Sequence, residues 1–209
     1  MLDYKLLALK TLQQTVPSFI ISWPCYPQHD FERSLSLEDS TFLQFFAKLS
    51  KELEILRNTW LIVTADHGFY GGEYANTHEG LLDRRSLPLF IRPPDATLLE
   101  EPELLQTLHW NSDIVTGHFD FYRTLIDLAG RANMKERNTV KGNSLHGQSL
   151  LTKLDKDRTC AEAGIVKQMC ACNLSPPGTP VNMRTLQIRK TLMWKMLKCG
   201  KETCLRKKL

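Results

Sequence analysis

A short apolar run that ends in an Asp-His pair constrains the fold of this chain most. Residues 59–67 read T-W-L-I-V-T-A-D-H, and Gly68 follows at once. A continuous apolar run of this length is typical of a strand that is covered on both faces. Neighbouring side chains on a straight strand point to opposite faces, so Asp66 and His67 converge only where the chain turns, which Gly68 makes easy. The run predicts a buried strand that delivers two polar side chains to a sheet edge.

The residues before this run predict a parallel strand-helix-strand unit. Residues 18–23 (S-F-I-I-S-W) have a strand pattern that Pro24 closes. Residues 36–56 carry Phe and Leu at steps of three and four, with Ser36 as the capping residue, and predict one amphipathic helix. This crossover is long enough to join two parallel strands. We therefore expect an α/β fold.

The rest of the chain divides by composition. Further expected elements are a helix at 2–13, a glycine-bearing loop at 68–85, a strand at 86–92, a helix or loop at 104–110, a helix at 116–129 ended by Gly130, and a turn leading into a short helix at 142–151. We expect residues 1–156 to form the α/β domain, 157–180 a cysteine-containing segment, and 181–209 a basic, poorly ordered tail.

The charge of the chain is concentrated at one end. Residues 183–209 hold nine Lys or Arg against a single Glu, a net charge of +8, which leaves −4 for residues 1–182. Such a tail attracts nucleic acid or an anionic membrane, or is simply solvated. Because no aromatic side chains alternate with a basic surface, we favour the solvated tail and expect no nucleic-acid partner. No apolar run reaches about 18 residues, so no transmembrane segment is predicted.

Five of the six cysteines lie in the last third of the chain. They are Cys160, Cys170, Cys172, Cys199 and Cys204, and Cys25 stands alone. The C-x-C spacing is too tight for an ordinary pair of zinc ligands, so a disulfide-bearing segment is the better interpretation. Disulfides imply an oxidising compartment, whereas the charged N-terminus does not have the pattern of a signal peptide.

Three motifs together resemble one known superfamily. They are V-T-A-D-H-G at 63–68, T-H-E-G-L-L-D-R-R-S-L-P-L-F-I-R at 77–92, and H-F-D-F-Y-R-T-L-I-D-L-A-G at 118–130. Their order and spacing resemble the sulfatase-type branch of the alkaline-phosphatase-like superfamily over roughly residues 17–150. Residues 158–172 (R-T-C-A-E-A-G-I-V-K-Q-M-C-A-C) are similar to an animal family of sulfatase-like ectodomains called domain of unknown function 229.

The resemblance implies a fold and an activity. The fold would be a three-layer sandwich, a sheet flanked by helices, present here in incomplete form. The activity would be metal-dependent hydrolysis of sulfate or phosphate esters by an extracellular or membrane-anchored ectodomain. Asp66 and His67 would bind the metal, with His118 as a further ligand. A carboxylate oxygen and an imidazole nitrogen suit zinc or manganese, and suit calcium less well.

The resemblance also implies a substrate site and shows what this chain lacks. His29, His78 and Arg84 would contact the ester, although each also fits an ordinary surface role. No C-x-P-S-R nucleophile motif is present, and Cys25 lies in a different context. We therefore expect a partial catalytic domain that is inactive alone, or else a non-catalytic, secreted or cell-surface interaction module that keeps the fold.

Overall fold

The computed structural model describes residues 2–12, 17–23, 34–132 and 146–174. Seven α-helices and two strands form in these ranges. The elements are α1 (Leu2–Leu12), α2 (Ser34–Leu49), α3 (Leu53–Asn58), β1 (Leu61–Thr64), η1 (Tyr74–Asn76), α4 (His78–Arg85), β2 (Leu89–Arg92), α5 (Asp95–Glu100), α6 (Glu103–Asn111), α7 (His118–Ala132), η2 (Lys167–Met169) and η3 (Ala171–Leu174). None of the helices in these ranges is long and apolar enough to cross a bilayer.

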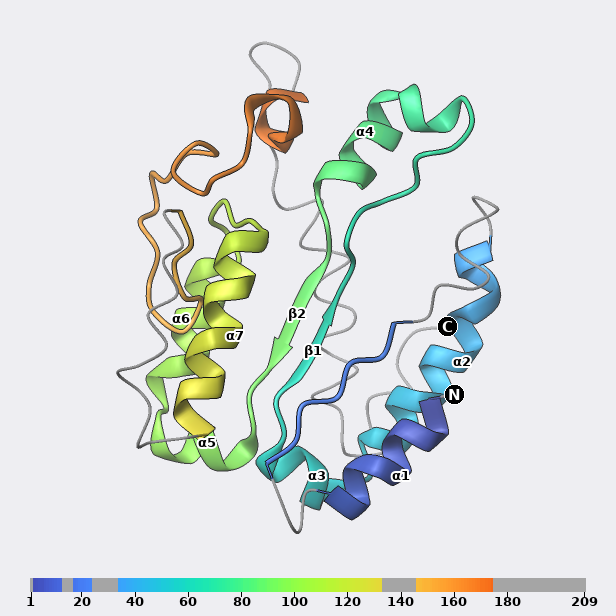
Figure 1. The fold of residues 1–209 in the computed structure, drawn as a ribbon, viewed down its shortest axis with the longest axis vertical. Helices are drawn as coiled ribbons and strands as arrows, with labels where there is room; N and C mark the ends of the chain where they lie inside the picture. Colours follow the sequence, from blue (N-terminus) through green and yellow to red (C-terminus); the bar gives the residue numbers. More distant parts are fainter. Residues whose placement is uncertain (1, 13–16, 24–33, 133–145, 175–209) are drawn as a thin grey trace, which may run out of the picture.

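The two strands pair antiparallel and lie between two groups of helices. Leu61 pairs with Arg92 and Thr64 with Leu89. Helices α1 to α3 lie on one side of the pair and α5 to α7 on the other, while α4 extends beyond the strand ends (Figure 1). The architecture is therefore a mixture of helices and strands, consistent with the α/β class, with a two-stranded sheet in the described residues.

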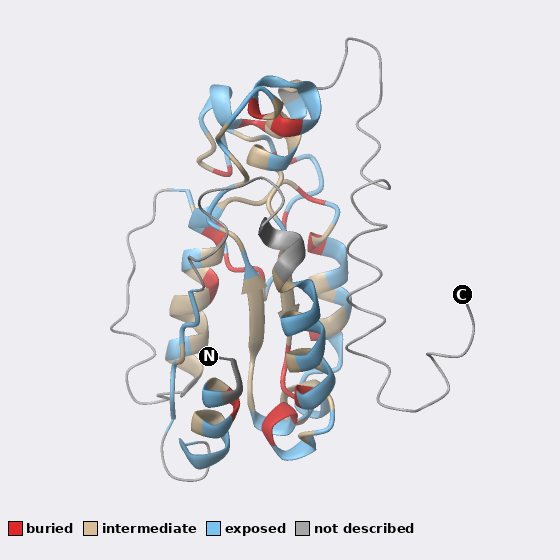
Figure 2. Ribbon diagram, turned by 90° about the vertical axis from the view of Figure 1, so that its right-hand side faces the viewer, coloured by how far each residue is buried: buried red, intermediate tan, exposed pale blue. Residues whose placement is uncertain are grey.

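Two separate apolar clusters stabilise the helices on either side of the strands. The first joins α1, α2 and α3 through Leu6, Leu49, Ile55 and Leu56, with Leu61 of β1 packed against it. The second comprises Ile114, Leu150 and Leu154, and Leu89 and Ile91 of β2 pack against it together with Leu108 of α6. Figure 2 shows buried residues on both sides of the strands. Each strand therefore contributes to a different cluster.

The predicted strand at 18–23 is wrong for this structure. Residues 17–23 have no regular secondary structure, and the side chains of Phe19, Ile21 and Trp23 are 72%, 62% and 65% exposed. A strand needs a hydrogen-bonded ladder to a neighbouring strand and cover for its apolar face. In the described residues the sheet contains only β1 and β2, and these three apolar side chains are exposed. The parallel strand-helix-strand unit is consequently not formed. The chain instead leaves β1, passes through α4 and returns as antiparallel β2.

The single helix predicted at 36–56 is two helices. Residues 50–52 form a tight turn, in which the amides of Lys51 and Glu52 donate to the carbonyls three residues earlier at 3.0 Å. The Ser50 hydroxyl also donates to the carbonyl of Ala47, at 2.9 Å. This break reorients the chain so that α2 and α3 both supply side chains to the cluster around Leu6.

Other element boundaries also differ from expectation. The predicted loop at 68–85 contains α4, helix α5 was not anticipated, and α7 continues past Gly130 to Ala132. Residues 146–151 form turns and bends with no helix. The structure confirms helix α1, strands β1 and β2, and the helical alternative for α6. Both strands are shorter than predicted, and β1 is only partly buried with Thr64 exposed, whereas a buried strand was predicted. The basic tail, His29, Cys25, Cys199 and Cys204 lie outside the described residues.

Candidate functional site

The Asp66-His67 pair lies on a turn that begins where β1 ends. The Thr64 hydroxyl donates to the carbonyl of Pro88 at 3.0 Å, which ties the end of β1 to the start of the returning chain. Gly68 then lies against the backbone of α4, because a Cβ atom there would approach the carbonyl oxygen of Asp83 to 2.4 Å. Only glycine permits this contact. The turn therefore packs directly against α4.

The hydrogen bonds of this turn orient two ligand atoms. The His67 ring nitrogen Nδ1 is 2.8 Å from the carbonyl oxygen of Gly68. A carbonyl can only accept, so in the neutral ring the proton lies on Nδ1 and Nε2 keeps its lone pair. Nε2 lies 3.6 Å from Oδ2 of Asp66. The other oxygen, Oδ1, accepts the main-chain N–H of His67 at 2.8 Å.

Aromatic and cationic groups flank this pair. The Tyr70 ring contacts the His67 ring edge to face, with 4.7 Å between centroids. The guanidinium carbon of Arg84, from the last turn of α4, lies 4.7 Å from the centroid of the same Tyr70 ring. Nε of Arg84 is buried and has no hydrogen-bond partner in the described part of the chain. The side chains of Asp66 and His67 remain 52% and 55% exposed, so the pair is open to solvent.

The remaining predicted site residues are not gathered around this turn. His78 is the first residue of α4, where Thr77 caps the helix by accepting the N–H of Gly80 at 3.1 Å. His118 is the first residue of α7, and both histidines are exposed. Among the described residues, no third histidine, cysteine or acid joins Asp66 and His67 in a group with ligand atoms within 4.8 Å of one another.

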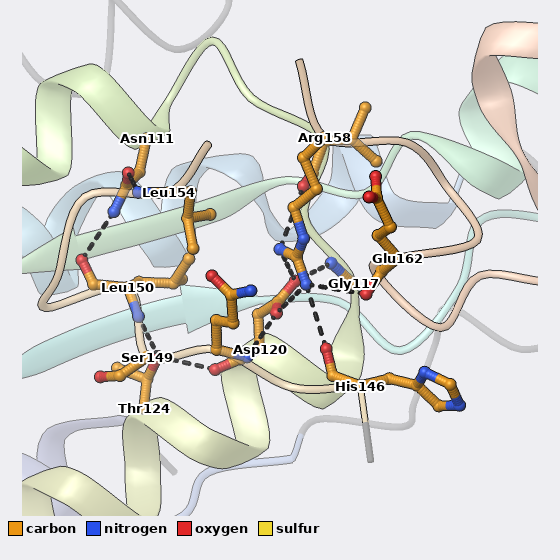
Figure 3. A network of polar contacts seen from close by, with 12 residues as sticks. Asn111, Gly117, Asp120, Thr124, His146, Ser149, Leu150, Leu154, Arg158 and Glu162 are labelled. Atoms are coloured by element: carbon orange, nitrogen blue, oxygen red, sulfur yellow. Dashed lines mark hydrogen bonds and ion pairs between the residues drawn. The ribbon is translucent and has the colours of Figure 1, made fainter. Parts of the chain in front are cut away.

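A second pair of polar side chains, Asp120 with Arg158, was missed by sequence reasoning. Their side chains are 0% and 2% exposed. Oδ1 of Asp120 accepts from Arg158 Nη2 and from the main-chain N–H of Gln148, both at 2.8 Å. Oδ2 accepts from Arg158 Nη1 at 2.9 Å and from the N–H of Gly117 at 2.8 Å. Figure 3 shows this network. Every lone-pair direction of the carboxylate is therefore used.

The arginine of this pair joins three segments. Besides Asp120, its guanidinium donates to the carbonyls of Val115, His146 and Glu162, at 3.4, 3.1 and 3.3 Å. We call Asp120, Thr124 and Arg158 the clamp. Its contacts connect α7 to residues 146–150 and to the start of the segment predicted to span 157–180.

Thr124, the third residue of the clamp, lies one helical turn after Asp120 on α7. Its hydroxyl donates to the carbonyl of Asp120 at 2.7 Å and accepts the N–H of Leu150 at 2.9 Å. The sequence signal was available, because Asp120 and Thr124 stand four residues apart on the helix and therefore share one face. A polar pair of this spacing beside apolar side chains indicates a buried network.

An open depression adjoins the clamp. It has a volume of about 590 Å³ and is lined by His146, Gly147, Gln148, Asp155, Arg158, Ala161 and Glu162. The main-chain N–H and the hydroxyl of Thr159 both donate to Oε2 of Glu162 at 2.7 Å. These hydrogen bonds, the main-chain one first, lower the pKa of Glu162 from its ordinary value of 4.5, and the charge of Arg158 adds to the effect.

The cysteine segment contains the disulfide that its composition predicted. Cys160 and Cys170 are joined, with their Cα atoms 5.9 Å apart. Cys172 is exposed and has no disulfide partner among the described residues. The three sulfur atoms all lie within 4.8 Å of one another.

Comparison with known proteins gives one match. The profile of the family described as "Protein of unknown function (DUF229)" matches residues 1–198. No curated protein and no solved structure matches the chain significantly.

Proposed function

This chain belongs to the DUF229 family, and from that premise we propose that it forms part of a metal-dependent domain that hydrolyses sulfate or phosphate esters. The proposed fold is the three-layer sandwich of the alkaline-phosphatase-like superfamily. Helices on both sides of the strand pair support this assignment (Figure 1). The proposed location is extracellular, as an ectodomain, and the Cys160–Cys170 disulfide supports it.

The geometry of the Asp66-His67 turn carries the proposal. Two ligands bound tetrahedrally at ordinary zinc distances lie about 3.3 Å apart, close to the 3.6 Å between His67 Nε2 and Asp66 Oδ2. The Gly68 carbonyl holds the other ring nitrogen of His67, as backbone carbonyls commonly do for metal-binding histidines. The donor set therefore fits zinc or manganese, and calcium is the third candidate.

Each residue around the turn has a proposed task. Asp66 and His67 would hold the ion, which when bound polarises an ester oxygen. Arg84 is held over Tyr70 beside them and offers a cation to the anionic group of the ester. His118 as a further ligand, and His29 and His78 as substrate contacts, stay predictions. We assign no nucleophile to this chain, so we expect negligible turnover from it alone.

Metal binding by the full chain tests the proposal. Manganese is the first probe, because thiolates favour softer metals and the cysteines would compete for zinc. We expect wild-type protein to bind one Mn²⁺ in equilibrium dialysis, and His67→Ala and Asp66→Asn to lose that binding. His109→Ala is the matched control, since His109 is also exposed but lies on α6. Equal binding by wild type and His67→Ala would overturn the assignment.

A second candidate function is a non-catalytic interaction module. The exposed apolar side chains of Phe19, Ile21 and Trp23, at alternate positions of one segment, favour it, because gathered apolar surface often marks a contact with another protein. The same dialysis separates the two functions. Absence of Mn²⁺, Zn²⁺ and Ca²⁺ binding at Asp66 and His67 would favour the module, whereas binding that needs His67 favours the hydrolase.

A further inference from the structure

Three cysteines meet on the segment that follows the clamp. Cys160 and Cys170 form the disulfide, and Cys172 follows two residues later in η3. The sulfur of Cys172 lies within 4.8 Å of both disulfide sulfurs. Their exposure differs, since Cys170 is 4% exposed, Cys160 is half-buried and Cys172 is exposed. Within the part of the chain that the structure describes, an accessible cysteine without a disulfide partner therefore lies beside a disulfide that has one buried cysteine.

Contacts other than the disulfide hold the Cys160 side of this arrangement in place. Arg158, two residues before Cys160, is buried in the clamp. The amide of Ile165 donates to the carbonyl of Cys160 at 2.8 Å. Gly164 has a φ of +71°, and a Cβ there would meet the Phe119 ring at 2.7 Å, so the loop packs closely on α7. We expect the sulfurs to remain near one another whichever pair is bonded.

We propose that Cys160, Cys170 and Cys172 form a thiol–disulfide exchange centre in which Cys172 attacks the sulfur of Cys160. The thiolate is the attacking species, so Cys172 first loses its proton. The Cys172–Cys160 bond forms as the Cys160–Cys170 bond breaks, and Cys170 leaves as a thiolate that takes up a proton. The step is an isomerisation, so it needs no external oxidant or reductant.

Attack at Cys160 is preferred over attack at Cys170 for a local reason. A bond between Cys170 and Cys172 would close a loop between residues only two positions apart, and so short a loop is stiff, which disfavours that bond. A Cys160–Cys172 bond closes a loop only two residues longer than the existing one, which has a sequence separation of 10. The two isomers therefore place similar constraints on the chain.

The exchange decides whether the protein presents a reactive thiol. With the Cys160–Cys170 bond, the free thiol is on exposed Cys172 and can form a mixed disulfide with a small disulfide such as oxidised glutathione. With the Cys160–Cys172 bond, the free thiol is on Cys170, whose present site is buried and suits a small apolar group. The partner class is therefore a soluble disulfide that reacts with only one isomer.

Disulfide mapping of cysteine variants tests the proposal. The background is the full chain with Cys25→Ser, Cys199→Ser and Cys204→Ser. In that background we expect Cys170→Ser to form a Cys160–Cys172 disulfide, detected by mass spectrometry after alkylation without reduction. Cys160→Ser is the matched variant, and we expect it to leave Cys170 and Cys172 both alkylated. Reduced Cys160 and Cys172 in the first variant, or a Cys170–Cys172 bond in the second, would overturn the proposal.

A measurement on the wild-type chain decides the question if a variant fails to fold. After an acid quench, denaturation and alkylation, we expect the label on Cys172 in most molecules and on Cys170 in a minority, on the order of 0.1–10%. Incubation with oxidised glutathione should trap Cys172 as the mixed disulfide and remove the Cys170-labelled form. A label confined to Cys172, or a native bond from Cys172 to Cys25, Cys199 or Cys204, would refute the exchange.

Discussion

The Asp66-His67 turn and the clamp both pair a carboxylate with a nitrogen-bearing side chain, yet their surroundings are opposite. The side chains of the first pair, Asp66 and His67, are 52% and 55% exposed, and their hydrogen bonds go to the backbone of the same turn. The second is 0% and 2% exposed and joins residues 38 positions apart. Oδ2 of Asp66 faces only His67 among the contacts described, whereas both oxygens of Asp120 are fully hydrogen-bonded. A saturated carboxylate stabilises the fold, and an unsaturated one can accept a ligand.

The largest expected effect comes from breaking the clamp. Asp120→Asn leaves the guanidinium of Arg158 buried without a counter-charge, because an amide carries none. Removing one partner of a buried ion pair costs about 3–5 kcal/mol. We expect the free energy of unfolding, measured by urea denaturation, to fall by that amount.

The matched substitution at the turn gives the contrast. Asp66→Asn removes a carboxylate of the same kind from an exposed position, where surface changes shift stability by about 0.5 kcal/mol or less. Its urea midpoint should coincide with that of the wild type. Equal losses from Asp66→Asn and Asp120→Asn would mean that the two pairs do not differ in role.

The next effect isolates the hydroxyl of the clamp. Thr124→Val keeps the shape of the side chain but leaves the buried N–H of Leu150 without its acceptor. An unsatisfied buried donor costs about 1–3 kcal/mol. Urea denaturation should show this loss, and hydrogen exchange at Leu150 should become faster. Unchanged exchange there would argue that Thr124 does not anchor residues 146–150.

A substitution at Gly68 should displace the Asp66-His67 turn from α4, against which it packs. An alanine Cβ would lie 2.4 Å from the carbonyl oxygen of Asp83, so α4 must move away. Such crowding typically costs about 1–3 kcal/mol. We expect Gly68→Ala to weaken Mn²⁺ binding as well, by displacing the carbonyl that orients His67. The control is Gly72→Ser, at a position where a Cβ meets nothing within 4 Å, although its φ of +66° adds local strain.

The smallest expected effect is a pH-dependent contribution of Glu162 to stability. The pKa of Glu162 is lowered by the hydrogen bonds from Thr159, so its stabilising contribution is present above the ordinary value of 4.5. That contribution is lost as the pH falls through the lower folded-state pKa. The difference in Tm between wild type and Glu162→Gln should be constant near neutral pH and shrink below pH 4.5. A Tm difference that grows as the pH falls would contradict a lowered pKa of Glu162 in the folded protein.

Local pattern was sufficient for some elements and insufficient for others. The apolar run at 59–65 predicted β1, and the helical pattern of residues 116–129 predicted most of α7. Residues 18–23 had an equally good strand pattern but form none, because a strand exists only with a partner. The turn at 50–52 also escaped prediction, since no Pro or Gly marks it.

The same distinction between local sequence pattern and tertiary contact applies to the candidate site. The sequence by itself determined that Asp66 and His67 follow a strand and that Gly68 turns the chain, because these are properties of neighbouring residues. Only the tertiary structure decided that Gly68 lies on α4, that Arg84 lies over Tyr70, and that Asp120 meets Arg158. Those contacts join residues far apart in the chain, and their energy depends on burial, which no local pattern specifies.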